Sequence, residues 1–215
     1  GGVHDVYISN EVIHPHKLAR VAALAHQVAA VAGGQLAIAV DSIEGVARLA
    51  QAMNDARTRT GKSAIIHVLV EIDVGQRRCG VAPGAAAVAL ALEVRKHAAL
   101  HFAGLQAYHG KAQHLRSAAE RRETISIVVD DVVYTRKLIE AKGLKVGLVT
   151  GAGTGTLVRE AASGVYGELQ AGSFMFMDAD YAANERDPAQ PQFEHALFVK
   201  SQVISSSATQ ARWTA

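Results

Sequence analysis

The chain has 215 residues, of which 49% are hydrophobic and 20% charged, and its formal net charge at pH 7 is +2. This length allows one domain with a sizeable core, or one domain and a piece of a second. The small net charge gives no reason to expect nucleic acid as a partner. The apolar runs are too short to span a membrane. The only cysteine, Cys79, excludes an internal disulfide, so we expect a cytoplasmic protein.

Apolar runs alternate with helical patterns along most of the chain. Strands are predicted at 6–9, 36–40, 64–73, 102–108, 146–150 and 165–170. Helices are predicted at 16–32, at 43–60, at 83–98, from about 115 to 142, and at 157–162. Six strands that alternate with five helices predict a parallel α/β architecture.

The strand pattern leaves a doubly wound sheet and a TIM-type barrel open, since both place functional loops at the carboxyl ends of strands. A closed (β/α)8 barrel takes eight units and this sequence supplies six. The segment 190–205 has no helix before it and is predicted as the first strand of a C-terminal β domain, after a polar linker at 184–191. The expected division is therefore 1–183 and 184–215. Both ends are abrupt, and we expect a chain cut at both.

A loop of glycines and threonines follows the fifth strand. The stretch 145–156 reads KVGLVTGAGTGT, a buried strand followed by a loop that can turn N–H groups and hydroxyls toward one phosphate. A tight turn without a ligand fits the same residues. A Walker loop does not fit, because no lysine follows the last glycine, and the spacing GxGxG differs from the dinucleotide pattern GxGxxG.

A second loop of this kind follows the sixth strand. Gly172 and Ser173 offer two more backbone N–H groups and a hydroxyl. If strands adjacent in sequence are adjacent in space, the two loops meet. TIM barrels often bind phosphate at the loops after two neighbouring late strands.

Other polar residues follow the third and fourth strands. Arg77 and Arg78 could neutralise a phenolate or carboxylate, although a solvated loop explains them equally well. Tyr108 could stack on a flat cofactor, and His109 and His114 could move protons, or all three could serve packing and capping. The histidine spacing matches no zinc pattern.

Four segments together carry a family resemblance: VEIDVGQRRCGV, GLQAYHGKAQH, VTGAGTGT and ELQAGSFMFMDADY. They resemble the D-threonine aldolase and D-serine dehydratase group of pyridoxal-phosphate enzymes, which is related to the alanine racemase barrel. The resemblance covers about 5–181 and is greatest for the D-threonine aldolase branch. It implies an incomplete TIM-type barrel with about six of eight strands, plus the start of a C-terminal β domain.

The resemblance implies a role for each matching residue. Arg78 corresponds to the arginine near the phenolic oxygen of pyridoxal phosphate, and Tyr108 to the ring against the pyridine face. Gln170 falls opposite the pyridine nitrogen, where a neutral partner is expected to leave that nitrogen less protonated. The candidate catalytic residues are Arg78, Tyr108 and His109. The remaining residues expected to contact the cofactor are Thr150, Gly153, Thr154, Gly155, Thr156, Gly172 and Ser173.

Two further parts of the family's active site match nothing in this chain. The lysine that carries the cofactor lies on the first barrel strand in the family, and this chain begins at what looks like the third. The divalent metal (Mn, Mg or Zn) is held in the C-terminal β domain, so no metal ligand is predicted here. The family also implies a small D-amino acid as substrate and a possible homodimer.

The implied activity is metal-assisted retro-aldol cleavage of D-3-hydroxy amino acids, such as D-threonine to glycine and acetaldehyde. Three alternatives remain at this point. The protein could be a dehydratase of D-serine or D-3-hydroxyaspartate, or a non-catalytic barrel that only binds pyridoxal phosphate. The third alternative is an inactive remnant whose sheet edges are exposed.

Overall fold

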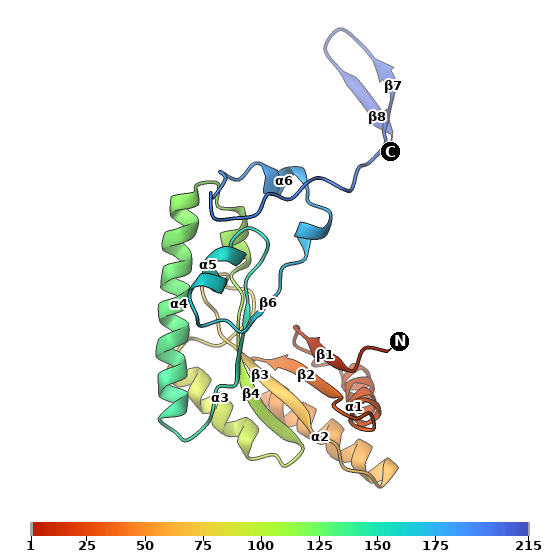
Figure 1. Cartoon of the computed structure of the whole chain (residues 1–215). Helices are drawn as coiled ribbons and strands as arrows, with labels where there is room; N and C mark the ends of the chain where they lie inside the picture. Colours follow the sequence, from red (N-terminus) through yellow and green to blue (C-terminus); the bar gives the residue numbers. More distant parts are fainter. Residues whose placement is uncertain (1, 215) are drawn as a thin grey trace.

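The computed structural model describes residues 2–214. Six strands form one parallel sheet, and they are β1 (Asp5–Ile8), β2 (Gln35–Val40), β3 (Ile66–Glu71), β4 (Leu100–Ala107), β5 (Leu148–Gly151) and β6 (Glu168–Leu169). Their order in the sheet is their order in the sequence (Figure 1). A doubly wound sheet would reverse this order at a switch point, whereas a barrel does not.

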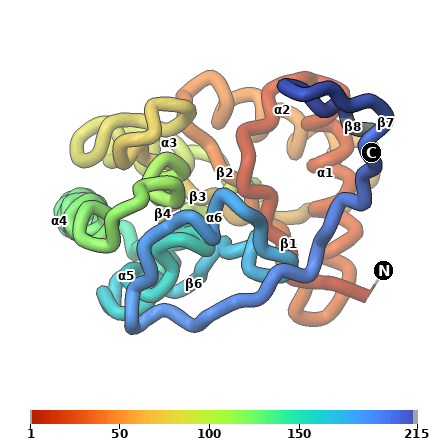
Figure 2. Tube along the Cα trace, turned by 90° about the horizontal axis from the view of Figure 1, so that it is seen from above, coloured from red at the N-terminus to blue at the C-terminus, as the bar shows by residue number. Residues whose placement is uncertain are grey.

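The helices all lie on the outer face of this sheet. They are α1 (Pro15–Ala29), α2 (Ile43–Thr60), α3 (Ala85–Arg95), α4 (Ala118–Glu140) and α5 (Leu157–Ala162). Seen from above, they form an arc around the strands (Figure 2). Within residues 2–214, β1 and β6 each pair with a single strand, so the sheet is not closed. This is an incomplete TIM-type barrel, and the predicted fold class is confirmed.

Local sequence signals fix the ends of several helices. Pro15 begins α1, in the first turn where a missing N–H costs nothing. The Ser42 hydroxyl accepts a hydrogen bond from the Gly45 amide at 3.2 Å and caps α2. Gly61, with φ of 67°, ends that helix in the left-handed region that glycine adopts without strain. The sequence predicted these limits because each depends on residues close in the chain.

The two faces of the sheet differ in chemistry. Leu36, Ile38, Val68 and Val70 belong to the core between the sheet and the helices. The residues that alternate with them point into the barrel, where several are polar and buried, including Glu71, Gln106 and Thr150. The apolar core therefore holds the outer layer together, and the inner face is free to carry a site.

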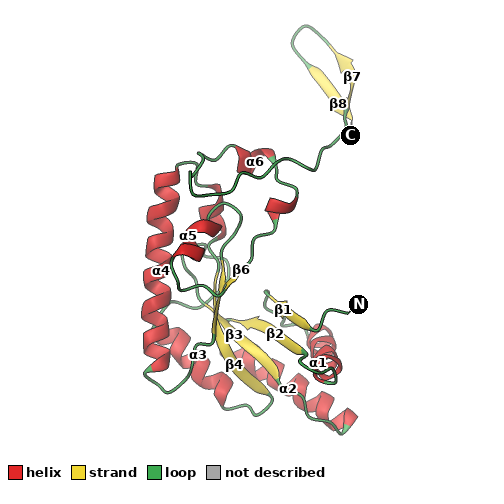
Figure 3. Cartoon of the chain, viewed as in Figure 1, coloured by secondary structure: helices red, strands yellow, loops and turns green. Residues whose placement is uncertain are grey.

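The chain beyond α5 differs most from the prediction. Strand β6 has two residues rather than six, although Gln170 still donates its amide to the Gly151 carbonyl at 2.7 Å. Short helical turns η1 (Gly110–His114), η2 (Ser173–Met175) and α6 (Ala179–Ala182) lie in the loops (Figure 3). No helix within residues 2–214 is both long enough and apolar enough to cross a membrane.

The predicted terminal strand starts later than expected and has a partner. Residues 193–200 are not in a strand, and β7 (Gln202–Ser206) pairs antiparallel with β8 (Ala211–Thr214). The polar stretch after 205, for which no element was predicted, contains the turn of this hairpin, where the Ser207 amide donates to the Gln210 carbonyl at 2.8 Å. Serine-rich polar sequence fits a turn as well as a disordered tail, and only pairing distinguishes them.

Candidate functional site

The predicted site residues follow the carboxyl ends of four neighbouring strands. Arg78 lies in the loop after β3, and Tyr108 and His109 come directly after β4. The glycine-threonine loop follows β5, and Gly172 and Ser173 follow β6. Because β3 to β6 are consecutive and parallel, these loops meet at one end of the half-barrel.

A hydrogen-bond network on the inner face centres on Gln106, which is 1% exposed. Its Nε2 donates to a carboxylate oxygen of Glu71 and to the Ser9 carbonyl, the latter at 3.3 Å. Its Oε1 accepts from the Tyr7 hydroxyl and, at 3.2 Å, from Nε2 of Gln170. A backbone carbonyl only accepts, so the contact with Ser9 fixes which way the Gln106 amide faces.

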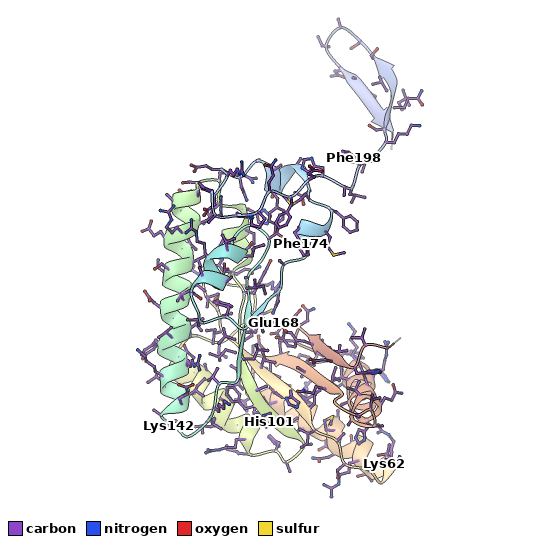
Figure 4. All side chains as sticks on the ribbon, in the orientation of Figure 1. Lys62, His101, Lys142, Glu168, Phe174 and Phe198 are labelled. Atoms are coloured by element: carbon purple, nitrogen blue, oxygen red, sulfur yellow. The ribbon has the colours of Figure 1, made fainter. Side chains whose placement is uncertain are left out.

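The same network fixes the amide of Gln170. Its Nε2 also donates to the Thr150 hydroxyl at 2.9 Å, and that hydroxyl donates to the Glu168 carboxylate at 2.6 Å. Glu168 belongs to β6 and is labelled in Figure 4. The Oε1 atom of Gln170 makes no hydrogen bond within residues 2–214, so it is the atom left for a ligand. The structure thus joins Thr150 and Gln170, as the sequence predicted them to share a site.

Two loops with unpaired backbone amides are joined to each other. The amide of Phe174 donates to the Thr154 hydroxyl at 3.0 Å, which ties the loop after β6 to the loop after β5. The N–H groups of Gly153, Thr154, Gly172 and Ser173 have no acceptor within the described part of the chain. Gly153 and Thr154 are buried, and a buried N–H without an acceptor is costly. Together with the exposed Gly172 and the partly buried Ser173, they give four N–H groups in joined loops that could bind an anion such as a phosphate.

The other two residues of the predicted phosphate loop make bonds within the protein. The Gly155 amide donates to Oε1 of Gln113 at 2.9 Å. The Thr156 hydroxyl accepts from Nε2 of Gln113 at 2.9 Å and donates to Glu160 at 2.7 Å. Gly155 and Thr156 therefore hold the loop in shape, and their contact with a cofactor stays a prediction. Sequence reasoning gave Gln113 no role, since only its burial reveals one.

The arginine loop lies over the buried carboxyl group of Glu71 and the partly buried one of Glu11. A guanidinium nitrogen of half-exposed Arg78 is 3.9 Å from Oε1 of Glu71. Burial, together with Glu11, raises the pKa of Glu71 to about 8, although Gln106 and Arg78 oppose the shift. At this distance the attraction of the Arg78 charge does not outweigh burial, so the Glu71 carboxyl group keeps its proton near neutral pH.

The same place offers the closest set of metal-type ligands in residues 2–214. Ligand atoms of Glu11, Glu71 and Cys79 lie within 4.8 Å of one another. Gln106 already occupies one oxygen of Glu71, and the cationic Arg78 opposes a metal ion there. We therefore do not assign this set as a metal site. Sequence reasoning missed Glu11, because only the fold brings the loop after β1 close to Glu71 at the end of β3.

Tyr108 and His109 are both half-buried. Burial, followed by Tyr181, raises the pKa of Tyr108, and the charge of Arg78 opposes this shift. Burial lowers the pKa of His109, and its Nδ1 accepts the Ala112 amide at 3.2 Å. A neutral imidazole that accepts at Nδ1 carries its proton on Nε2. His109 thus caps η1 and keeps a hydrogen-bond donor at Nε2.

The segment predicted as a linker is bound to the barrel. Asn184 donates to the Gln113 carbonyl at 2.8 Å, and the Glu185 carboxylate accepts the first amide of α4 at 2.9 Å. Asp187, which is 5% exposed, forms an ion pair with Arg159. Gln190 donates to the Thr154 carbonyl at 2.6 Å. We call residues 184–190 the strap.

Residues 11–180 match the family described as the N-terminal domain of alanine racemase, and the chain belongs to this family. A D-threonine aldolase of Arthrobacter sp is 44% identical over 207 residues, which are 96% of this chain and 51% of that protein. A 3-hydroxy-D-aspartate aldolase of Paracoccus denitrificans (strain Pd 1222) is 36% identical over 209 residues, 95% of this chain and 51% of that protein.

A solved structure agrees with these relatives. The crystal structure of D-threonine aldolase from Filomicrobium marinum has a TM-score of 0.85 and 42% identity, and the match covers 96% of this chain and 52% of that one. The resemblance to the D-threonine aldolase group is therefore confirmed. The chain spans about half the length of the curated relatives it matches.

Proposed function

We propose that this chain supplies the cofactor site of a pyridoxal-phosphate lyase that cleaves D-3-hydroxy amino acids, with D-threonine giving glycine and acetaldehyde. The unpaired amides of Gly153, Thr154, Gly172 and Ser173 in two joined loops support a phosphate at this place. The relatives named D-threonine aldolase and 3-hydroxy-D-aspartate aldolase support the reaction class. Bound pyridoxal phosphate supplies an electron sink for the carbanion left when the Cα–Cβ bond breaks.

The chain's own residues would bind and orient the cofactor. Arg78 donates to the phenolic oxygen from the end of β3, and the ring of Tyr108 packs against the pyridine face. The four amides hold the phosphate. The neutral His109 ring carries its hydrogen on Nε2, so it would offer a hydrogen-bond donor to the ligand at that atom.

The orientation of the Gln170 amide bears on the protonation of the pyridine nitrogen. Its Nε2 is engaged by Gln106 and Thr150, so only Oε1 can face the pyridine nitrogen. An acceptor at this place favours a protonated nitrogen, because hydrogen bonding to the charged form stabilises it. The two expectations for the protonation of this nitrogen, one from residue type and one from the orientation of the amide, both stay predictions.

A divalent metal and a homodimer are part of the proposal on the strength of the family resemblance, as is a cytoplasmic location. We also keep the division into 1–183 and 184–215 as a prediction, with the observation that the strap is bound to the barrel. Light scattering of the purified protein tests the dimer.

The activity is tested by replacing the matching segment of the Arthrobacter D-threonine aldolase with this chain. We expect the chimera, supplied with pyridoxal phosphate and Mn²⁺, to release glycine and acetaldehyde in equal amounts from D-threonine and none from L-threonine. Ammonia and a 2-oxo acid would indicate a dehydratase instead. A chimera that binds cofactor but releases neither would support the non-catalytic alternative.

The role of Arg78 is tested in the same chimera with its neighbour as control. Arg78→Ala should raise the Kd for pyridoxal phosphate about tenfold, since a hydrogen bond to a charged group contributes roughly 1.5–3 kcal/mol. Arg77→Ala should leave the Kd unchanged. Equal effects of the two substitutions would contradict the assignment.

A further inference from the structure

Two glutamine side chains hold the two ends of one peptide unit in the phosphate loop. Gln190 donates from Nε2 to the carbonyl of Thr154 at 2.6 Å. On the other side of the same peptide bond, the Gly155 amide donates to Oε1 of Gln113 at 2.9 Å. A peptide unit is planar, so bonds at both ends fix the orientation of the whole plane.

The preceding peptide unit is fixed from one side. The Gly153 carbonyl accepts the Thr156 amide at 3.2 Å and the Leu157 amide at 3.0 Å, at the start of α5. In a trans peptide the N–H points opposite to the C=O. The Thr154 N–H therefore points away from the first turn of α5 and stays free for a ligand.

Gln113 is itself held firmly. It is 1% exposed, and its Nε2 bonds to the Thr156 hydroxyl and, at 3.2 Å, to the His109 carbonyl. A Cβ on Gly153 would lie 2.5 Å from its Oε1, and a Cβ on Gly155 would lie 2.7 Å from its backbone oxygen. These two glycines are thus required by Gln113, before any ligand is considered.

Gln190 is the last residue of the strap and is held by the residues before it. Its amide donates to the Asp187 carbonyl at 2.9 Å, and Asp187 is anchored by the ion pair with Arg159 on α5. A cavity of about 300 Å³ lies between the strap and Gly155. The strap therefore reaches the loop mainly through the one bond from Gln190.

We propose that Gln113 and Gln190 are positioning residues that set the phosphate loop in its binding conformation before the ligand arrives. The strap then controls affinity for the phosphate group and leaves affinity for the ring unchanged. This inference rests on the proposed phosphate site. A preset loop spares the ligand the cost of ordering it.

The test compares two ligands that differ only in the phosphate, pyridoxamine 5′-phosphate and pyridoxamine. For Gln190→Ala, the Kd of pyridoxamine 5′-phosphate should rise about fivefold, the loss expected for one neutral hydrogen bond, while the Kd of pyridoxamine stays the same. Gln192→Ala, at an exposed position two residues beyond the strap, is the control and should change neither. A purely structural defect would weaken both ligands alike.

Hydrogen exchange of the Gly155 amide in the ligand-free protein tests the preset loop independently. Slow exchange is expected, and fast exchange would overturn the inference even if the phosphate preference stands. An unchanged preference in Gln190→Ala would also overturn it and leave the proposed function intact. A wild-type chain that binds the two ligands equally would overturn the phosphate site, and the inference with it.

Discussion

A single buried carboxyl group links the inner face of the barrel to the pH dependence of stability. Glu71 is 4% exposed, and its carboxyl group faces Glu11, Cys79, Gln106 and Arg78. Its pKa is raised from the ordinary value of 4.5 to about 8, mainly by burial. The folded state thus keeps a proton that the unfolded state releases above pH 4.5. Stability from this group is greatest below pH 4.5 and is lost as the pH rises through 8.

Glu71→Gln should remove this part of the pH dependence. Relative to wild type, we expect the variant to gain about 1–3 kcal/mol of unfolding free energy between pH 5 and pH 8, because the amide has no proton to lose. Urea unfolding at both pH values measures the difference. Glu123→Gln, at an exposed position on α4, is the control. A constant difference between Glu71→Gln and wild type across this range would contradict the raised pKa of Glu71.

At the scale of elements, an extra residue in β4 depends on one glycine. Val68 pairs with Phe102 and Leu69 with Gly104, so Ala103 has no partner in β3. Gly104 also pairs with Leu148, and a Cβ on Gly104 would lie 1.8 Å from the Leu148 carbonyl oxygen. The junction of β4 and β5, which carries the phosphate loop, therefore has no space for a side chain at this position.

Gly104→Ala should consequently separate β5 from β4. We expect a loss of more than about 3 kcal/mol, or no folded protein at all, because the clash involves backbone on both sides. Gly147→Ala is the matched control, since its Cβ would lie 3.2 Å from the Ala103 carbonyl. Circular dichroism melting compares the two, and a Gly104→Ala variant as stable as Gly147→Ala would disprove the close contact.

Elements with local signals were predictable from the sequence, and contacts between distant segments were not. The limits of α2 and α5 follow from Ser42, Gly61 and the glycine loop, all close in the chain. The strap was predicted as a linker because polar residues such as Asp187 and Gln190 look solvated until Arg159 and Thr154 are placed beside them. The glycines of the phosphate loop were predicted to serve a ligand. Two of them, Gly153 and Gly155, are also needed because a side chain at either position would clash with Gln113.

At the scale of the whole molecule, exposed apolar side chains gather in two segments, 174–176 and 197–199, the second of which leads into the C-terminal hairpin. Phe174 and Phe198 are labelled in Figure 4 and are 40% and 76% exposed. The side chains of β7 are all exposed, and the hairpin projects away from the barrel (Figure 1). The amide of Ala196 bonds to the Phe176 carbonyl at 2.8 Å. The hairpin therefore adds little to the stability of the barrel.

A chain that ends at Ala196 should melt within about 2 °C of the full chain, since a change of 1 kcal/mol shifts the melting temperature of a chain this size by roughly 2–4 °C. Differential scanning calorimetry measures it. A fall of 5 °C or more would show that β7 and β8 stabilise the barrel in solution.

The most direct measurement is a titration of the ¹⁵N-labelled chain with pyridoxal phosphate, followed at the backbone amides. We expect saturable binding in which the amides of Gly153, Thr154, Gly172 and Ser173 show the largest shifts, because these donors have no acceptor within residues 2–214 and lie in the two joined loops. Saturable binding that leaves these four amides unmoved, or the absence of binding, would contradict the placement of the cofactor.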